Sequence, residues 1–343
     1  MDPIVNPYTP NAGARPQELA GRGAELDQFR VLVGRLKRGT TEQSMIVRGL
    51  RGVGKTVLLN AFENQAESDG FLTYYHEVTP DSDLVTEIAR DAQSALARLD
   101  LGTRARQKIR EALAHLGTIK LAGPEGLELS VDLGSADEGV IARDLSELLV
   151  EIGRAAAEKG RGVVFLLDEV QFVREREYRA FITALHRVTQ KALPVTLAAA
   201  GLPQIPQLSG EARSYAERLF SFPEIANLPT DAATAALAEP ARSQGVEYEP
   251  EALRRAVEWT EGYPFYLQQL GKDAERATFV RAEIPDDRAR WIDPGDEYNK
   301  LGYYRVYGTR VRYEIDGKES SFEVTSLISW RGEWYVVHLT GFK

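Results

Sequence analysis

One eight-residue stretch, residues 49–56, constrains the fold of this chain more than any other. It reads Gly-Leu-Arg-Gly-Val-Gly-Lys-Thr and fits the pattern G-x-x-x-x-G-K-[ST] at every fixed position. A strand-like segment (residues 45–47) precedes it and a helix-like segment (residues 57–62) follows. A glycine-rich turn in this context points backbone N–H groups at one spot, beside the positive end of a helix dipole. The stretch therefore predicts a phosphate-binding loop within an α/β fold.

The loop also predicts roles for its side chains. Lys55 is expected to reach the β and γ phosphates of a nucleoside triphosphate, and the Thr56 hydroxyl is expected to ligate Mg²⁺. The residues expected to contact the nucleotide here are Gly49, Leu50, Arg51, Gly52, Val53, Gly54, Lys55, Thr56 and Val57.

A second motif, residues 163–169, reads Val-Val-Phe-Leu-Leu-Asp-Glu. Five apolar residues that end in two carboxylates are typical of a buried parallel strand that delivers charge to the rim of a sheet. We expect Asp168 to hold Mg²⁺, directly or through water, and Glu169 to orient and polarise the attacking water. The alternative is that both acids merely begin a polar loop after a core strand. The phosphate loop upstream favours the first interpretation.

Composition excludes several classes of site. The 343 residues suffice for two or three domains, and the absence of cysteine excludes disulfides, thiolate nucleophiles and Cys-based metal sites. The four histidines show no metal-ligand spacing. The net charge of −9 opposes a surface dominated by contacts with nucleic-acid phosphates, so DNA binding is possible only through a local basic patch. No apolar run approaches the ~18 residues needed to cross a bilayer, and the first residues do not resemble a signal peptide. A cytoplasmic protein without a membrane partner is expected.

The pattern of apolar residues predicts a three-layer α/β fold with a parallel five-stranded sheet. Proline-rich residues 1–18 are expected to form an extended arm, residues 19–229 the ATPase core, residues 230–280 a small helical lid and residues 281–298 a linker. Residues 299–343 are expected to form an antiparallel three-stranded meander with a turn at Asp316-Gly317. The expected core strands are 44–47, 71–78, 163–168, 195–200 and 222–228; the expected core helices are 24–37, 83–99, 104–116, 141–159 and 174–192, with a hairpin within 119–133.

These motifs resemble the AAA+/STAND type of P-loop ATPase, specifically proteins similar to archaeal ATPases and origin-recognition initiators. Leu19-Ala20-Gly21-Arg22 looks like the box that packs near adenine, Asp168-Glu169-Val170-Gln171 like an Asp-Glu-x-Gln variant, and Gly262-Tyr263-Pro264 like the lid motif that approaches the base. The resemblance covers roughly residues 15–275. It implies ATP and Mg²⁺ as ligands, nucleotide contacts from Gly21, Arg22 and Pro264, and a strand order of 5-1-4-3-2. It also implies a nucleotide held between core and lid, with a core–lid rearrangement that often occurs within an oligomer.

The chain departs from this family pattern in three places. Where many relatives carry a polar sensor residue at the end of the fourth strand, residues 198–201 read Ala-Ala-Ala-Gly, which predicts slow hydrolysis unless Gln204 substitutes. Phe265 stands near the place of the lid arginine of initiators. An aromatic β segment replaces the usual winged helix, so DNA binding by that route is not expected.

Arginines in two other places have alternative interpretations. Arg218 precedes the fifth strand, where such ATPases often carry an arginine that acts on the phosphate of a neighbouring subunit in a homo-oligomer. Alternatively, it pairs with an acid on an exposed helix. In the tail, arginines and tyrosines could form a face for single-stranded nucleic acid, but nearby acids favour a sheet with one solvated and one buried face. The tail residues are Tyr303, Tyr304, Arg305, Tyr307, Arg310, Arg312 and Tyr313.

Together these features predict an ATP-binding, Mg²⁺-dependent and slow ATPase that acts as a molecular switch, with Lys55, Glu169 and Arg218 as catalytic residues and Thr56 and Asp168 as metal ligands. One alternative is a non-hydrolysing, nucleotide-bound scaffold whose C-terminal sheet binds an unknown protein partner. The other is a DNA-associated, initiator-like ATPase.

Overall fold

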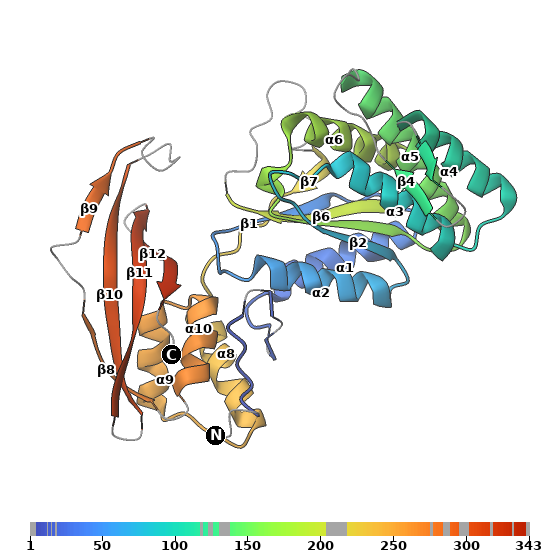
Figure 1. Cartoon of the computed structure of the whole chain (residues 1–343). Coiled ribbons are helices and arrows are strands. Elements are labelled where there is room, and N and C mark those ends of the chain that lie inside the picture. The colour runs from blue at the N-terminus through green and yellow to red at the C-terminus, as the bar shows by residue number, and fades with distance from the viewer. Residues whose placement is uncertain are drawn as a thin grey trace. The chain divides into compact units, whose positions relative to one another are not determined.

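The chain folds into two compact units in the computed structural model (Figure 1). The core unit contains Asn11–Ala235 and Glu261–Phe265, and the tail unit contains Met1–Pro10, Ala236–Thr260 and Tyr266–Lys343. The structure describes residues 5–11, 13, 14, 16, 17, 19–116, 119–122, 126–129, 138–203, 218–274, 277–283, 289–294, 302–315, 318–330 and 333–340.

The core unit is built on a parallel sheet of five strands. These are β1 (Ser44–Arg48), β2 (Leu72–Glu77), β5 (Val163–Asp168), β6 (Val195–Gly201) and β7 (Phe220–Ser221). Their order is β2-β5-β6-β1-β7, so the parallel strands, counted along the chain, lie in the order 2-3-4-1-5. Read from the other edge, this is the 5-1-4-3-2 order that the family resemblance implied. The predicted fold class is confirmed.

Helices cover both faces of this sheet (Figure 1). On one face lie α1 (Gly23–Lys37) and α2 (Lys55–Ser68), where the Phe29 and Phe62 rings stack with centroids 4.3 Å apart. On the other face lie α3 (Leu84–Arg98), α4 (Thr103–Leu116), α5 (Glu138–Glu158) and α6 (Glu175–Gln190). Alternate residues of β5 serve the two faces: Phe165 packs in the cluster with α3–α6, and Leu166 packs with α1 and α2. A strand buried on both faces must be apolar throughout, which explains the unbroken run before Asp168.

The hairpin predicted within residues 119–133 is present as β3 (Ile119–Ala122) paired antiparallel with β4 (Gly126–Leu129). The fifth core strand was placed wrongly at 222–228, because β7 is Phe220–Ser221 and only an isolated bridge from Arg48 to Glu224 follows it. Pro223 explains the early end, since it has no N–H to donate to a ladder and contributes only its carbonyl, which accepts from Arg48 N at 2.8 Å.

Along the chain, three helices follow β7 and precede the C-terminal strands: α8 (Thr230–Ser243), α9 (Pro250–Thr260) and α10 (Pro264–Ala274). In the tail unit, the N-terminal arm packs against α8 and α10 through Tyr8, which is 3% exposed. The Tyr8 hydroxyl donates to the Leu237 carbonyl, and the ring lies directly against Gly271, where a Cβ atom would come within 2.4 Å of it. The buried Tyr8 ring, together with hydrogen bonds from Asn6 to the Lys272 carbonyl and from the Thr9 N–H to Gln268, holds the arm to these helices.

The tail unit also contains an antiparallel sheet of five strands, where the sequence predicted three. Strands β10 (Tyr303–Ile315), β11 (Lys318–Trp330) and β12 (Glu333–Thr340) form the expected meander. Strands β8 (Ala277–Glu283) and β9 (Ala289–Ile292) both pair with β10 and lie in residues assigned to the lid and the linker. They were missed because their short, charged sequences carry little alternation of their own, and they are stabilised by pairing with a distant strand.

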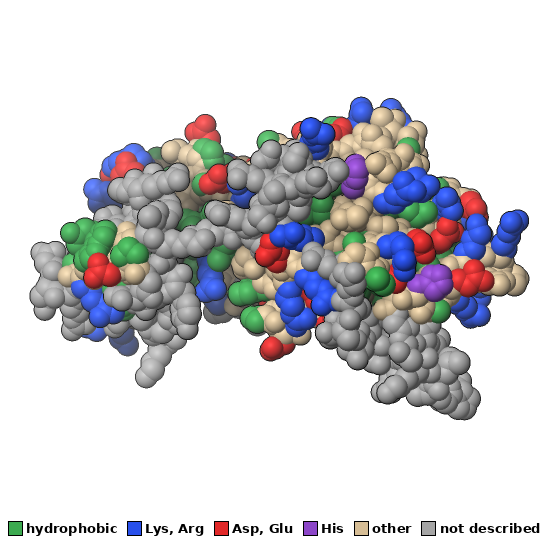
Figure 2. All heavy atoms as spheres, turned by 90° about the horizontal axis from the view of Figure 1, so that it is seen from above, with side chains coloured by type: hydrophobic (Ala, Val, Ile, Leu, Met, Phe, Trp, Pro, Cys, Tyr) green, Lys and Arg blue, Asp and Glu red, His purple; other side chains and the backbone are tan. Residues whose placement is uncertain are grey.

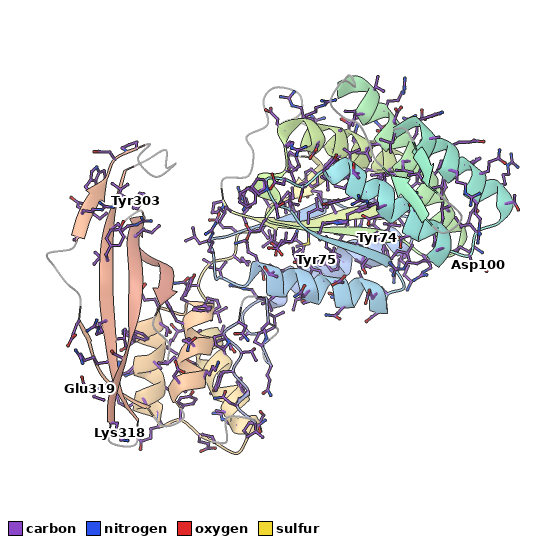
Figure 3. The ribbon with its side chains drawn as sticks, viewed as in Figure 1. Tyr74, Tyr75, Asp100, Tyr303, Lys318 and Glu319 are labelled. Carbon is purple, nitrogen blue, oxygen red and sulfur yellow. The ribbon has the colours of Figure 1, made fainter. Side chains whose placement is uncertain are left out.

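Ion pairs on this sheet favour the two-faced interpretation of the tail arginines. Arg312 donates to Glu283 and to Glu319, with both N···O distances 2.7 Å, and Glu319 lies near the start of β11 (Figure 3). The turn predicted at Asp316-Gly317 lies outside the described residues. Arg312 is thus committed to cross-strand carboxylates. Among the described residues, no helix combines the length and apolar character needed to span a membrane.

Candidate functional site

The phosphate loop lies between the end of β1 and the start of α2, as its sequence predicted. Gly52 and Gly54 have φ values of +74° and +95°, in the left-handed region that favours glycine. Close packing also requires glycine at positions 49 and 52. A Cβ atom on Gly49 would lie 2.5 Å from the Ile225 carbonyl oxygen, and one on Gly52 would lie 2.1 Å from the Tyr263 hydroxyl oxygen. Replacing these glycines with larger residues would therefore distort the backbone of the loop.

Thr56 and Asp168, 112 positions apart in the chain, meet at the carboxyl ends of β1 and β5. The Thr56 hydroxyl donates to Asp168 Oδ2 at 2.6 Å, and the Tyr75 hydroxyl, from β2, donates to the same oxygen at 3.1 Å. The other carboxylate oxygen, Oδ1, accepts the backbone N–H of Glu169 at 2.9 Å. Asp168 is only 3% exposed, so these three donors compensate for most of its lost hydration. Figure 3 shows where Tyr75 lies in the core unit.

Lys55 is buried at the first residue of α2, with 6% of its surface exposed. Its Nζ atom donates to the Leu50 carbonyl at 2.7 Å, across the loop. Burial lowers the pKa of Lys55, while the carboxylates of Glu169 and Asp168 oppose this shift. The amine is therefore held in a confined space that also contains both predicted acids.

Glu169 immediately precedes the short 3-10 helix η1 (Val170–Phe172) and has a left-handed φ of +53°. Its carboxylate accepts a hydrogen bond from the Gln171 amide, and the amide oxygen of Gln171 accepts the Leu202 N–H at 3.1 Å. Gln171 was recognised in the sequence only as part of a motif and not as a site residue.

The two flanking motifs also meet at the loop. The Arg22 guanidinium, 6% exposed, donates to the Val53 carbonyl at 2.9 Å and to the Ala226 carbonyl at 2.6 Å. Burial lowers its pKa, and the Glu25 carboxylate partly offsets this. From the other motif, the Tyr263 hydroxyl donates to the Arg51 carbonyl at 2.5 Å. Two side chains from outside the loop thereby hold two of its carbonyls.

The backbone of both motifs is close-packed. Gly21 has a φ of +66° and leaves no space for a Cβ atom beside Ala232, which would lie 2.8 Å away. Gly262 has a φ of +70° and abuts the Leu228 carbonyl. Pro264 follows Tyr263 as the first residue of α10, a position that suits its fixed φ. Contacts of Gly21, Arg22 and Pro264 with a nucleotide stay predictions.

Arg218 does not join this cluster within the core unit. It is exposed, and its carbonyl accepts from Gln43 at 3.1 Å. Since Phe220 pairs with Ser44, Arg218 lies at the amino end of β1, whereas the loop follows its carboxyl end. Four strand steps, roughly 13 Å, separate the two ends. Arg218 is therefore placed away from the loop of its own chain. Gln204, the expected sensor substitute, lies outside the described residues.

Three side chains that contact the site were absent from the predicted set: Tyr75, Gln171 and Tyr263. Gln171 and Tyr263 stand inside recognised motifs, so their positions carried a usable signal. Tyr75 carried none, because its contact with Asp168 depends on β2 lying beside β5, with Glu77 opposite Asp168.

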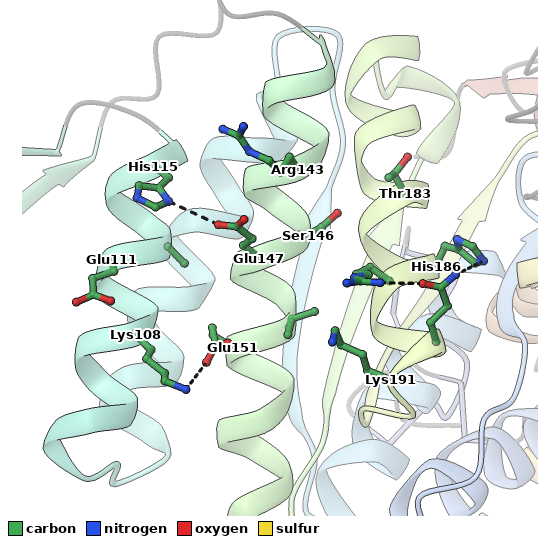
Figure 4. A pocket seen from close by; sticks show the side chains of 14 residues that line it. Lys108, Glu111, His115, Arg143, Ser146, Glu147, Glu151, Thr183, His186 and Lys191 are labelled. Atoms are coloured by element: carbon green, nitrogen blue, oxygen red, sulfur yellow. Dashed lines mark hydrogen bonds and ion pairs between the residues drawn. The ribbon is translucent and has the colours of Figure 1, made fainter.

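A separate groove of about 570 Å³ lies among α4, α5 and α6 (Figure 4). Its α4–α5 wall carries the pairs Lys108–Glu151, 3.8 Å apart, and His115–Glu147, 3.6 Å apart. Its α6 wall carries Lys191 and other basic side chains, and Figure 2 shows basic, acidic and histidine side chains interspersed over this part of the molecule. The lining, which comes from described helices, includes no phosphate-loop residue, so this groove is not the nucleotide site.

The parallel sheet order, the glycine loop and the Thr56–Asp168 contact define a P-loop nucleotide-binding protein. The sequence pattern of the AAA ATPase domain matches residues 18–198, more than half of the chain. The chain belongs to the AAA ATPase domain family, whose name implies ATP binding and ATPase chemistry.

Solved structures with a similar fold include Cdc6p from Pyrobaculum aerophilum, at 15% identity and a TM-score of 0.47, covering 80% of this chain and 64% of that one. The Walker-type ATPase of Pyrococcus abyssi matches at 15% identity and a TM-score of 0.44, covering 76% of this chain and 68% of that one. AMPPCP-bound DnaA from Aquifex aeolicus matches at 18% identity and a TM-score of 0.42, covering 78% of this chain and 65% of that one. The chain thus spans about two thirds of the length of these proteins. No curated protein sequence matches it.

Proposed function

We propose that this chain is a Mg²⁺-dependent ATPase that hydrolyses ATP slowly and acts as a molecular switch. Membership of the AAA ATPase domain family supports ATP as the ligand. The observation that carries the finer proposal is the 2.6 Å contact between Thr56 Oγ1 and Asp168 Oδ2 at the end of the phosphate loop. It brings together the two oxygen ligands that the sequence predicted for a metal ion.

This donor set suits Mg²⁺, which prefers hard oxygen ligands and keeps few protein contacts alongside the phosphates of its substrate. Thr56 and Asp168 would hold the ion, and Tyr75 would steady the Asp168 carboxylate through its hydrogen bond. When bound, Mg²⁺ supplies charge neutralisation to the β and γ phosphates.

The remaining chemistry comes from the chain itself. The loop N–H groups and the α2 amino terminus bind phosphate oxygens, and Lys55 adds a cation beside them. Glu169, next to Asp168, orients the attacking water and accepts its proton. Tyr263 and Arg22 hold the Arg51 and Val53 carbonyls, which keeps the loop in its binding conformation before the nucleotide arrives.

A second candidate function is a nucleotide-bound scaffold that does not hydrolyse ATP. The observation that favours it is the end of β6, where residues 198–201 carry no polar side chain that could contact a γ phosphate. The intact Asp168–Glu169 pair favours turnover instead.

Phosphate release with Mg²⁺ and ATP separates the two functions. We expect Glu169→Gln to retain ATP binding in calorimetry while turnover falls about 10²- to 10⁴-fold, the usual effect of losing a general base. Lys55→Ala should lose both binding and turnover. Lys191→Ala, a lysine that lines the α4–α6 groove, is the matched control and should change neither. If the unmodified protein binds ATP but releases phosphate at the same background rate as Glu169→Gln and Lys55→Ala, the scaffold function is correct.

A catalytic role for Arg218 requires a second copy of the chain, because this residue lies away from its own phosphate loop. We expect Arg218→Ala and Glu169→Gln each to show strongly reduced turnover alone and to regain turnover when mixed, since each supplies what the other lacks. Sedimentation measurements with ATP should then show an oligomer. An unknown protein partner and a cytoplasmic location stay predictions, and no described feature favours DNA binding.

A further inference from the structure

The Gln171 side chain ties the Glu169 carboxylate to the end of β6. Its amide nitrogen donates to Glu169 Oε2, and its amide oxygen accepts the Leu202 N–H at 3.1 Å. Each end of the amide therefore faces a partner of the opposite hydrogen-bonding type, a carboxylate for the N–H₂ group and a backbone N–H for the oxygen. This complementarity defines a single orientation of the amide group.

The local backbone is built around this side chain. Glu169 has a φ of +53°, a conformation that costs a non-glycine residue of order 1–3 kcal/mol and persists where its surroundings enforce it. Its N–H is held by Asp168 Oδ1 and its carbonyl by the Phe172 N–H at 3.0 Å. The result is a tight turn that brings residues 169 and 171 onto the same side.

The end of β6 leaves space for the Gln171 amide. A Cβ atom on Gly201 would lie 2.8 Å from Gln171 Oε1 and 2.8 Å from Val170 Cγ1, so any larger residue would displace the amide. In addition, the Gly201 carbonyl accepts the N–H of Gly49, the first residue of the phosphate loop, at 3.2 Å. The segment Gly201–Leu202 thus bonds to the loop on one side and to Gln171 on the other.

We propose that Gln171 is a positioning residue that sets the orientation of the Glu169 carboxylate and couples it, through Leu202, to the end of β6 and the phosphate loop. This proposal rests on the proposed hydrolysis of ATP. It assigns to a side chain in the Asp-Glu-x-Gln motif a link between the phosphate loop and the Glu169 carboxylate. Residues 198–201 cannot make this link, because they have no polar side chain.

The test compares Gln171→Met, which preserves length and removes both hydrogen bonds, with Gln190→Met as a matched control on α6. For Gln171→Met we expect turnover at saturating ATP to fall about 10- to 100-fold, the effect of misplacing a catalytic group by about an ångström, while the ATP dissociation constant changes less than about twofold. Gln171→Glu retains an acceptor for Leu202 but sets two carboxylates against each other, and it should lose at least as much turnover. Unchanged ATP affinity shows that each variant is folded, and Gln190→Met should match the unmodified protein.

A double-mutant cycle identifies the residue through which Gln171 acts. In a Glu169→Gln background, followed as single turnover of labelled ATP with excess protein, Gln171→Met should cause no further fall, because the carboxylate that it positions is already absent. An equal fall in both backgrounds would overturn the proposal, as would unchanged turnover or a change confined to KM. If the unmodified protein binds ATP without hydrolysing it, the proposed ATPase function and this proposal both fail. If it hydrolyses ATP with no effect of Gln171, only this proposal fails.

Discussion

Gly52 lies beneath the hydroxyl group of Tyr263, and its substitution by alanine tests how the phosphate loop is held. A Cβ atom there would lie 2.1 Å from the Tyr263 hydroxyl oxygen and 2.7 Å from the ring carbon that bears it. The tyrosine has little freedom to withdraw, because its hydroxyl donates to the Arg51 carbonyl at 2.5 Å and its ring packs against the core cluster of α1 and α2.

Gly54 provides the matched comparison. It also has a left-handed φ, +95°, but a Cβ atom on Gly54 would meet nothing within 4 Å. Gly54→Ala should therefore cost only the conformational penalty, about 1–2 kcal/mol. Gly52→Ala should cost the same penalty plus about 1–3 kcal/mol of overpacking. For a unit of this size each kcal/mol lowers the melting temperature by about 2–4 °C, so the two variants should differ by several degrees.

Scanning calorimetry of the nucleotide-free protein, following the transition of the core unit, provides the measurement. Tyr263→Ala supplies the second arm, because removing the ring leaves space for the Gly52 methyl group. In that background the two glycine variants should have equal cost. The reasoning is refuted if Gly52→Ala is no more destabilising than Gly54→Ala, or if the difference between them survives the loss of the Tyr263 ring.

Three further predictions concern Asp168 as the proposed metal ligand, the N-terminal arm and the half-buried His76. Asp168→Asn should abolish the increase in ATP affinity that Mg²⁺ produces in the unmodified protein; calorimetry with and without Mg²⁺ measures it, and a retained increase would exclude Asp168 as a ligand. Tyr8→Ala should destabilise the tail unit by about 3–5 kcal/mol in denaturant unfolding, while Tyr8→Phe, which keeps the ring, should cost much less; equal costs would show that the ring does not pack as described. Burial lowers the pKa of His76. The hydrogen bond to Asp91 and the negative charges of Asp91 and Glu87 raise this pKa, and their combined effect exceeds that of burial, so the net shift is upward. Because the pKa of His76 is higher in the folded state than the unfolded value of about 6.5, protonated His76 stabilises the fold fully below about pH 6.5, and this stabilisation is lost as pH rises through the folded pKa. The melting temperatures of the unmodified protein and His76→Gln should therefore differ most near about pH 6 and converge at alkaline pH.

Local sequence patterns predicted the parts of the site that are built from residues adjacent in the chain. The glycines at 52 and 54 were identifiable because their backbone conformations exclude most other residues, and β5 was identifiable because a strand buried on both faces must be apolar. The same reasoning failed at β8 and β9, where pairing with β10 supplies the stability that their short sequences lack.

The amino-acid sequence by itself determined that this chain has a phosphate loop, two acids at the end of a buried strand and an α/β sheet around them, because these features are written in runs of adjacent residues. Only the tertiary structure decided which distant atoms complete the site: Tyr75 on Asp168, Arg22 on Val53, and Gln171 between Glu169 and Leu202. The physical reason is that hydrogen bonds are short and directional, so partners on separate strands are selected by sheet order and register, which no local pattern encodes.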